Sequence, residues 1–220
     1  MNKNLNNVTV LIPALNEEKN IAKVINIIKN IKIVDEIIVI DNNSTDNTAQ
    51  IAKELGVKTI FCEKRGKGYS MEEGIKNTSN DIIVFVDGDI CNYDTEFINK
   101  LVDPIFNRNC EFVKSSFTRE GGRVTELTAK PLLKLLFPEL SKFDQPLSGI
   151  IAGKKSFFES LKFEKDSGID IGILIDAYLL NIKMEQVYIG EIKNDSQDWK
   201  DLVAMSEQVA RTILKKKKYL

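Results

Sequence analysis

The sequence predicts an α/β fold in which a mostly parallel, Rossmann-like sheet is flanked by helices. In the first hundred residues, four short runs rich in Ile and Val alternate with segments whose apolar residues follow helical spacing. Each apolar run ends in a polar loop, as expected for strands that are buried on both faces of a parallel sheet. The alternation therefore predicts repeated strand–helix units joined by right-handed crossovers.

Composition limits the kind of protein this can be. A chain of 220 residues is long enough for one domain with a real hydrophobic core. Its 31 basic and 32 acidic side chains leave a formal net charge of -1, so no overall field favours nucleic acid as a partner. Because no apolar stretch reaches the roughly 18 residues that span a bilayer, we expect no stable membrane insertion.

Cysteine and histidine content restricts the chemistry. Cys62, Cys91 and Cys110 are odd in number and lack C-x-x-C spacing, which argues against a disulfide framework or a zinc site and favours a cytoplasmic protein. Histidine is absent, which excludes Ser-His and Cys-His catalysis and imidazole metal ligation. Catalysis must then depend on carboxylates, lysine, arginine, hydroxyls, the backbone and any metal.

The first two strands are expected to present polar loops at one edge of the sheet. Val8–Ile12 is the first strand, which we expect Pro13 to stop, and a helix should follow with apolar residues at helical spacing: Ile21, Val24, Ile25 and Ile28. The second strand, Asp35–Ile40, ends in the polar run Asp41–Asp46. Turn and helix-cap formation alone would explain that run. Its position beside the end of the first strand also suits a ligand site.

A basic loop follows the next unit. After a helix over Thr45–Leu55 and a short strand over Thr59–Cys62, the segment Glu63–Gly68 carries Lys67 between two glycines. A flexible loop of this kind can bring an ammonium and backbone N–H groups against a diphosphate. A solvated turn is the simpler explanation of the same residues. A helix over Tyr69–Thr78 should come next.

The fourth strand ends in two acids one residue apart. The run Ile82–Val86 is followed by Asp87, Gly88 and Asp89. Carboxylate oxygens are ligands that Mg²⁺ or Mn²⁺ prefers, and Gly88 permits close backbone approach, so the sequence suggests a metal that bridges to phosphates. A polar turn after a core strand is the alternative.

Four blocks together carry a resemblance to a known family. They read V-T-V-L-I-P-A-L-N-E-E, I-I-V-I-D-N-N-S-T-D-N-T, R-G-K-G and I-V-F-V-D-G-D, and in this order they resemble the nucleotide-sugar domain of family 2 type glycosyltransferases with the GT-A fold. The resemblance implies a UDP-sugar donor with Mg²⁺ or Mn²⁺. The donor-binding residues that it implies are Pro13, Ala14, Leu15, Glu17, Asp41, Ser44, Lys67, Asp87, Gly88 and Leu147.

The second half resembles a narrower group. The segments around Gly122–Thr125, Gln145–Gly149 and Gly168–Asp176 are similar to glucosyl-3-phosphoglycerate synthases and their mannosyl relatives, which are retaining enzymes. The resemblance covers roughly Val8 to Asn194 and implies an acceptor site made by Gly122, Arg123, Val124 and Thr125.

Elementary chemistry permits that acceptor site. Arg123 offers a bidentate fork, Thr125 a hydroxyl, and a helix that starts near Val124 a positive N-terminus. A capped helix start with a solvated arginine is the alternative. We interpret Arg119, also near this region, as a solvated surface arginine.

The resemblance also assigns catalytic roles and shows departures. Asp89, Lys67 and Asp170 are the implied catalytic residues, with Asp170 standing where the family has a glutamate that contacts sugar hydroxyls. Without the resemblance, the helical spacing of its apolar residues predicts a core helix over Gly168–Asp176. The family's arginine and metal-binding histidine fall on Ile192 and Asn194, so the implied metal ligands are Asp87, Asp89 and Asn194. Ser167 and Ile150 also replace expected residues.

The leading hypothesis is transfer of a hexose from a UDP-sugar to a small phosphorylated acid such as 3-phosphoglycerate. Residues 1–220 would form one domain, with residues 1–100 binding the donor and residues 101–220 the acceptor, and the protein would form a homodimer as its relatives do. Rival hypotheses are a nucleotide-sugar-binding protein impaired in catalysis and a transferase acting on a lipid phosphate. An NAD-type domain is disfavoured because no G-x-G-x-x-G follows the first strand. A last helix is expected over Trp199–Leu214, with Lys215–Lys218 as a frayed tail.

Overall fold

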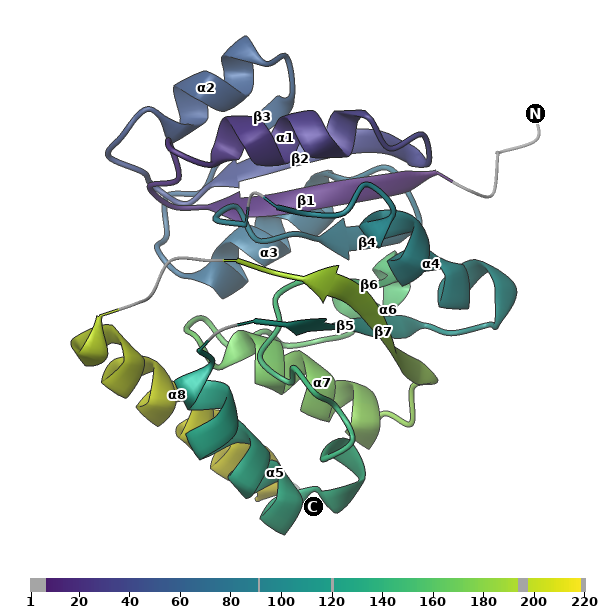
Figure 1. Ribbon diagram of the computed structural model, residues 1–220, viewed down its shortest axis with the longest axis vertical. Coiled ribbons are helices and arrows are strands. Elements are labelled where there is room, and N and C mark those ends of the chain that lie inside the picture. Colours follow the sequence, from purple (N-terminus) through teal and green to yellow (C-terminus); the bar gives the residue numbers. More distant parts are fainter. Residues whose placement is uncertain (1–6, 91, 120, 194–197, 219–220) are drawn as a thin grey trace.

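The computed structural model describes residues 7–90, 92–119, 121–193 and 198–218 (Figure 1). Within these residues a seven-stranded sheet runs in the order β3-β2-β1-β4-β6-β5-β7. The strands are β1 (Val8–Ala14), β2 (Val34–Asp41), β3 (Lys58–Phe61), β4 (Ile82–Phe85), β5 (Phe112–Thr118), β6 (Ile151–Lys154) and β7 (Met184–Glu191). The α-helices are α1 (Ile21–Lys29), α2 (Thr48–Glu54), α3 (Lys67–Asn77), α4 (Phe97–Asn107), α5 (Lys130–Leu136), α6 (Lys155–Glu159), α7 (Ile169–Leu179) and α8 (Trp199–Lys217). A π-helical turn, η1 (Thr125–Ala129), precedes α5, and a 3₁₀ turn, η2 (Pro138–Leu140), follows it.

The predicted mostly parallel sheet is confirmed. β1 pairs in parallel with β2 and β4, β2 with β3, and β5 with β7. Only β6, among the described strands, runs antiparallel to its neighbours, β4 and β5. The carboxyl ends of β1, β2, β4 and β5 therefore lie at one edge of the sheet, and polar loops follow them there.

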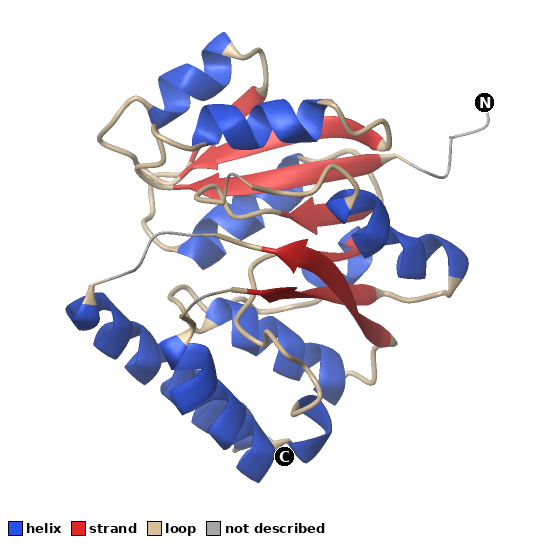
Figure 2. Ribbon diagram, in the orientation of Figure 1, coloured by secondary structure: helices blue, strands red, loops and turns tan. Residues whose placement is uncertain are grey.

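Helices lie on both faces of the sheet (Figure 2), and an apolar cluster is buried on each face. Alternate residues of β1 explain why, because successive side chains of a strand point to opposite faces. Val10 and Ile12 are buried with α1 and α4, whereas Leu11 is buried with α3 and α7. The strands thus bury both faces, which fits their runs of Ile and Val.

The expectation that Pro13 stops the first strand is wrong. β1 continues to Ala14, and Pro13 pairs with Ile40 of β2. The Leu11 carbonyl accepts a hydrogen bond from the Val86 N–H on the β4 side, and Pro13, two residues on, faces the same side. Since pairing with β4 ends at Leu11, the missing N–H of Pro13 leaves no ladder partner unsatisfied.

The basic loop is shorter and more ordered than predicted, because Lys67 is the first residue of α3. Gly66 has a φ of 135°, and its N–H donates to the Asn42 side chain at 2.7 Å. A Cβ at Gly66 or Gly68 would lie 2.3 or 2.0 Å from a backbone carbonyl oxygen of Lys165 or Glu164. The glycines therefore permit close backbone packing, which holds Lys67 in place.

The C-terminal lysines are also more ordered than predicted. Helix α8 runs to Lys217, and the buried Lys216 pairs with Asp176 of α7 at 2.6 Å. Lys215 pairs with Glu164 at 3.1 Å. The expectation of a frayed, solvated tail is wrong for these residues, because carboxylates of the preceding segments face them. No helix in the described ranges is long and apolar enough to cross a bilayer.

Candidate active site

The carboxyl edge of the sheet contains a pocket of about 360 Å³. Its walls come from the ends of β1, β4 and β5, from the starts of α3 and α7, from the turn before β6, and from α8. The lining residues are Pro13, Ala14, Leu15, Glu17, Asn42, Gly66, Lys67, Ser70, Asp87, Gly88, Asp89, Ile90, Phe117, Arg119, Leu147, Ser148, Gly149, Asp170 and Met205. The structure thus brings most of the residues predicted for the donor site into one pocket.

Lys67 joins two acids from distant parts of the chain. Its Nζ lies 3.1 Å from Asp87 Oδ1 and 3.0 Å from Asp170 Oδ2. Burial opposes the charge on Lys67, but the two carboxylates outweigh it and raise the pKa of the lysine. The ammonium is therefore permanently charged at neutral pH. The second oxygen of Asp170, Oδ1, is buried without a partner among the described residues, so it is free to accept a hydrogen bond from a ligand.

Asp89 and Glu17 are acids that the pocket makes hard to ionise. Burial, and then the charge of Asp87, raises the pKa of Asp89 to about 6. Burial, and then the charge of Asp89, raises the pKa of Glu17 to about 7. Such shifts arise where carboxylates share a poorly solvated space without enough positive charge. The pocket therefore favours an added cation.

A divalent metal fits this donor set. Asp87 and Asp89 offer hard oxygen atoms, which suit Mg²⁺ or Mn²⁺. In the described part of the chain no group of three His, Cys, Asp or Glu side chains could hold an ion, so further ligands would come from a bound molecule or water. Mg²⁺ commonly binds in this way, through one or two carboxylates and substrate phosphates. Asn194, the third predicted ligand, lies outside the described residues.

Hydrogen bonds join the loop after β1 to the loop after β2. The N–H of Ser44 donates to Asp41 Oδ1 at 3.2 Å, and the Ser44 hydroxyl accepts from the Asn16 N–H at 3.0 Å. Asp41 is buried and neither it nor Ser44 lines the pocket. These two predicted donor residues are next to the end of β1, where Asp41 pairs with Ala14, and outside the pocket lining.

The turn before β6 shapes the middle of the pocket. Leu147, Ser148 and Gly149 are buried and line it. A Cβ at Gly149 would lie 2.2 Å from Lys67 Nζ and 2.4 Å from Asp87 Oδ1. Glycine is therefore required at this position for the ion pair to form.

Lys114 is a site residue that the sequence analysis missed. It is fully buried in β5, and its Nζ donates to the backbone carbonyl of Asp170 at 2.9 Å. Burial lowers its pKa to about 8. It ties β5 to the first turn of α7, which carries Asp170. A lysine inside the apolar run of a strand was the available signal, because buried lysines are rare unless paired.

The predicted acceptor segment lies beside this pocket. Thr125 and Val124 are buried, and Thr125 Oγ1 accepts a hydrogen bond from Arg119 Nη2 at 3.2 Å. Arg123 is exposed and does not line the pocket, nor does Gly122. Arg119 does line it and is half-buried. The interpretation of Arg119 as a solvated surface residue is therefore wrong, because the chain after β5 turns inward.

Three departures from the family pattern have structural roles. Ile192 is buried in the core beneath α4, and its N–H donates to the Thr118 carbonyl at 2.9 Å. Ile150 is buried in the same core. The N–H of Ser167 donates to the Gln208 side chain of α8 at 3.1 Å, which fixes the loop before Asp170.

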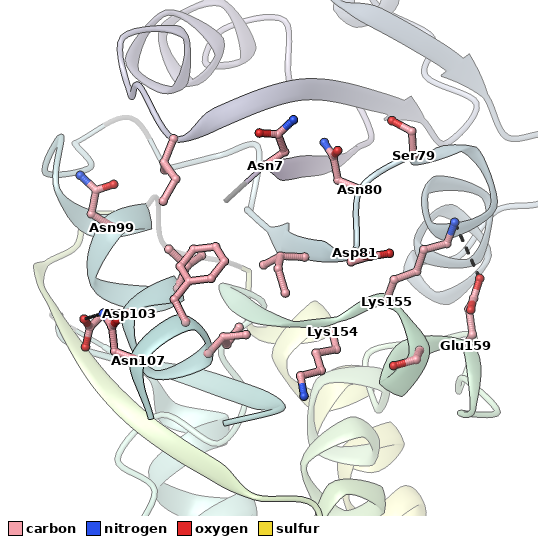
Figure 3. Close-up of a pocket in the computed structure, with 16 residues that line it drawn as sticks. Asn7, Ser79, Asn80, Asp81, Asn99, Asp103, Asn107, Lys154, Lys155 and Glu159 are labelled. Carbon is pink, nitrogen blue, oxygen red and sulfur yellow. Dashed lines mark hydrogen bonds and ion pairs between the residues drawn. The ribbon is translucent and has the colours of Figure 1, made fainter. Parts of the chain in front are cut away.

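A second, larger hollow lies at the opposite edge of the sheet, with a volume of about 1230 Å³ (Figure 3). Figure 3 shows Asn99, Asp103 and Asn107 of α4 on one side and Lys155 with Glu159 of α6 on the other. Lys155 donates to the Thr78 carbonyl at 2.8 Å, and its ion pair with Glu159 is long, at 3.8 Å. Amide side chains are prominent in this hollow.

Comparison with known proteins identifies relatives of the chain. The family model described as glycosyl transferase family 2 matches residues 9–165. The glucosyl-3-phosphoglycerate synthase of Mycolicibacterium smegmatis is 36% identical over 94% of this chain and 76% of its own length.

Solved structures agree in fold. Glucosyl-3-phosphoglycerate synthase from Mycobacterium tuberculosis, in complex with Mn²⁺, UDP-glucose and phosphoglyceric acid, superposes with a TM-score of 0.92 at 37% identity. The match covers 97% of this chain and 80% of that one. A second structure of that enzyme, with Mg²⁺ and UDP, also gives a TM-score of 0.92 at 37% identity, over 97% of this chain and 80% of that one.

Proposed function

Because this chain belongs to glycosyl transferase family 2, we propose that its carboxyl-edge pocket transfers glucose from UDP-glucose to 3-phosphoglycerate, with Mn²⁺ or Mg²⁺ bound. The observation that carries the proposal is the ion-pair cluster of Lys67, Asp87 and Asp170 beside the acid Asp89. Relatives with the same fold bind this donor, this acceptor and these metals.

The donor diphosphate fits beside Asp87, Asp89 and Lys67. The two acids would hold the metal, which supplies positive charge to the diphosphate as it leaves. Lys67 offers a second fixed cation at the same place, held 3.1 Å from Asp87. Asp170 would accept a hydrogen bond from a sugar hydroxyl through its unpaired Oδ1.

The acceptor reacts through its single hydroxyl. The bond between the anomeric carbon and the diphosphate oxygen breaks, and the acceptor oxygen bonds to that carbon on the same face, which retains the configuration. The hydroxyl proton passes to a diphosphate oxygen, and UDP leaves. No side-chain base is needed, which suits a chain without histidine.

We assign the donor to residues 1–100 and the acceptor to residues 101–220. The pocket supports this division because Lys67, Asp87 and Asp89, beside the proposed diphosphate, come from the first half, whereas Arg119, which bonds Thr125 of the predicted acceptor segment, comes from the second. Leu147 and Asp170, also from the second half, would contact the donor sugar where the two halves meet. Both halves contribute strands to one sheet, so the substrates would meet at the junction of β4 and β6.

Release of UDP tests the proposal. Purified protein is mixed with Mn²⁺, UDP-glucose and 3-phosphoglycerate, and each component is omitted in turn. We expect release only when all three are present. Metal-dependent binding of UDP-glucose without release in the complete mixture would instead support a binding protein, the rival that the apolar Ile192 favours.

We also propose a cytoplasmic homodimer. Cys62 and Cys110 are buried free thiols, which suits a reducing compartment. Exposed apolar side chains on η1, α5 and α8 would form the contact between copies: Leu127, Leu135, Trp199 and Val203. Light scattering should give a dimer mass for the wild type and a monomer mass for Leu135→Glu; a wild-type monomer would contradict the assembly.

A further inference from the structure

Arg119 differs from the other cation of the active-site pocket in how much of its hydrogen-bonding capacity is used. Among the described residues that line the pocket, Lys67 and Arg119 are the cationic side chains. Lys67 is committed to Asp87 and Asp170. Arg119 makes a hydrogen bond from Nη2 to the neutral hydroxyl of Thr125, and the described residues give it no ion pair within 4 Å.

The guanidinium of Arg119 retains unused donors in a confined space. Its Nε is buried and has no hydrogen-bond partner among the described residues. A guanidinium has five N–H donors in a fixed fork, and leaving a buried donor unpaired is costly. The ring of Phe117 lies 5.5 Å away and supports the guanidinium without using a donor.

The backbone at Gly122 and at Thr118 lies close to the Arg119 guanidinium and to its chain segment. Gly122 has a φ of 82°, and a Cβ there would be 3.3 Å from both Nε and Nη2 of Arg119. The carbonyl of Thr118, the preceding residue, accepts a hydrogen bond from the N–H of Ile192, which directly follows β7. Arg119 therefore leaves β5 beside the apolar Ile192 and turns toward the acids of the pocket.

The position of Arg119 connects the two substrate regions. It contacts Thr125, which lies in the segment assigned to the acceptor, and it lines the same pocket as Asp87 and Asp89. A planar fork matches a carboxylate or a phosphate through paired hydrogen bonds. The acceptor of the proposed reaction carries both groups.

We infer that Arg119 binds an anionic group of the acceptor and thereby positions its hydroxyl beside the donor sugar. This inference rests on the proposed function and names the acceptor contact within it. It adds Arg119, which lines the pocket, to the acceptor residues predicted at Gly122–Thr125.

Calorimetric binding of 3-phosphoglycerate, in the presence of Mn²⁺ and UDP, tests the inference without requiring turnover. Arg119→Gln should weaken acceptor binding roughly 10- to 100-fold, as expected when a charged hydrogen bond is lost. Arg119→Lys, which keeps the charge but not the fork, should recover part of the loss. Arg211→Gln is the matched control and should change binding less than threefold, because Arg211 is an exposed arginine of α8 that pairs with Glu207 and does not line the pocket.

Two further measurements distinguish acceptor recognition from a structural effect of the substitution. The affinity for UDP-glucose and the melting temperature of Arg119→Gln should stay close to those of the wild type. Glycerate, which has only the carboxylate, and glycerol 3-phosphate, which has only the phosphate, identify the group that Arg119 contacts. The substitution should weaken the binding of one of them and leave the other unchanged.

The inference fails if Arg119→Gln binds 3-phosphoglycerate as the wild type does, if it loses UDP-glucose binding equally, or if Arg211→Gln causes the same loss. Wild-type protein that binds 3-phosphoglycerate through Arg119 but releases no UDP would contradict the proposed activity alone. If the wild type turns over and Arg119→Gln turns over equally fast, the Arg119 inference alone is contradicted.

Discussion

The two hollows at opposite edges of the sheet differ in volume and in chemistry. The amino-edge hollow is larger, about 1230 Å³, while the carboxyl-edge pocket is about 360 Å³. In the larger one, Lys155 bonds a backbone carbonyl and the exposed Asp81 contributes to the wall. In the smaller one, Lys67 pairs with two acids, Asp89 is held above its ordinary pKa, and donors and acceptors remain unpaired.

The proposed active site is therefore distinguished by converging charge rather than by volume. Parallel strands explain it, because their carboxyl ends bring several loops together at one edge. A substitution at the carboxyl edge can be compared with a matched substitution at the amino edge. A pH dependence can be compared with that of a variant that lacks the titrating group.

Asp89→Asn should have the largest effect. It would remove a proposed metal ligand and with it the charge that stabilises the leaving diphosphate, so we expect kcat/KM to fall at least about 100-fold. Asp81→Asn, at the amino edge, should retain near wild-type turnover. Equal losses in the two variants, measured by UDP release, would remove the distinction between the edges.

Lys67→Met should be nearly as harmful. Without the ammonium, Asp87 and Asp170 lose their shared partner and the diphosphate loses a cation, so we expect turnover to fall about 100-fold. Lys155→Met should leave turnover intact and lower the free energy of unfolding by about 1 kcal/mol, because one hydrogen bond to Thr78 is lost. Urea unfolding and steady-state kinetics on both variants check this pair.

Gly149→Ala should lower turnover about tenfold or more, since the new methyl group would lie where Lys67 and Asp87 meet. Gly153→Ala in β6 is the control. Its methyl group would press on the Glu111 carbonyl and the Phe158 ring at 3.0 Å, so it should cost stability and spare activity. A Gly149→Ala variant with full activity would show that the ion pair is not required.

Metal binding should depend on pH. The pKa of Asp89 is about 6 in the metal-free protein, so below that pH a proton must leave before the carboxylate binds a cation. The affinity for Mn²⁺ should therefore weaken by up to about tenfold per pH unit below 6 and level off above 7. Titration of Mn²⁺ by electron paramagnetic resonance from pH 5 to 8 measures this, and Asp89→Asn should lose the dependence.

The smallest effect is a pH dependence of stability from Glu17. Folding raises its pKa from 4.5 to about 7, so the folded metal-free protein holds a proton that the unfolded chain releases. The contribution to stability is complete below pH 4.5 and is lost as the pH rises through 7. The melting temperature of Glu17→Gln should fall less across this range than that of the wild type; parallel curves would exclude the effect.

The fold and most residues that line the carboxyl-edge pocket could be predicted from the sequence. Runs of Ile and Val located β1, β2 and β4, and the polar residues after them located the pocket edge, because local periodicity determines both. Lys67, Asp87 and Asp89 were identified by short motifs together with a family resemblance.

The position of Arg119 in the pocket could not be predicted in the same way. Whether Arg119 or Arg123 enters the pocket depends on how the chain turns after β5, and Gly122 with its positive φ determines that turn. The C-terminal lysines were misread because Asp176 and Glu164, their partners, lie far from them in sequence. Long-range pairing of this kind leaves no local pattern.

A crystal structure of this chain with Mn²⁺, UDP-glucose and 3-phosphoglycerate would show whether metal, donor and acceptor bind together at the carboxyl edge of the sheet. We predict an anomalous manganese peak at Asp87 and Asp89, with the diphosphate beside Lys67 and an acidic group of the acceptor at Arg119. Ligand density in the amino-edge hollow, or a manganese peak away from both acids, would contradict the account.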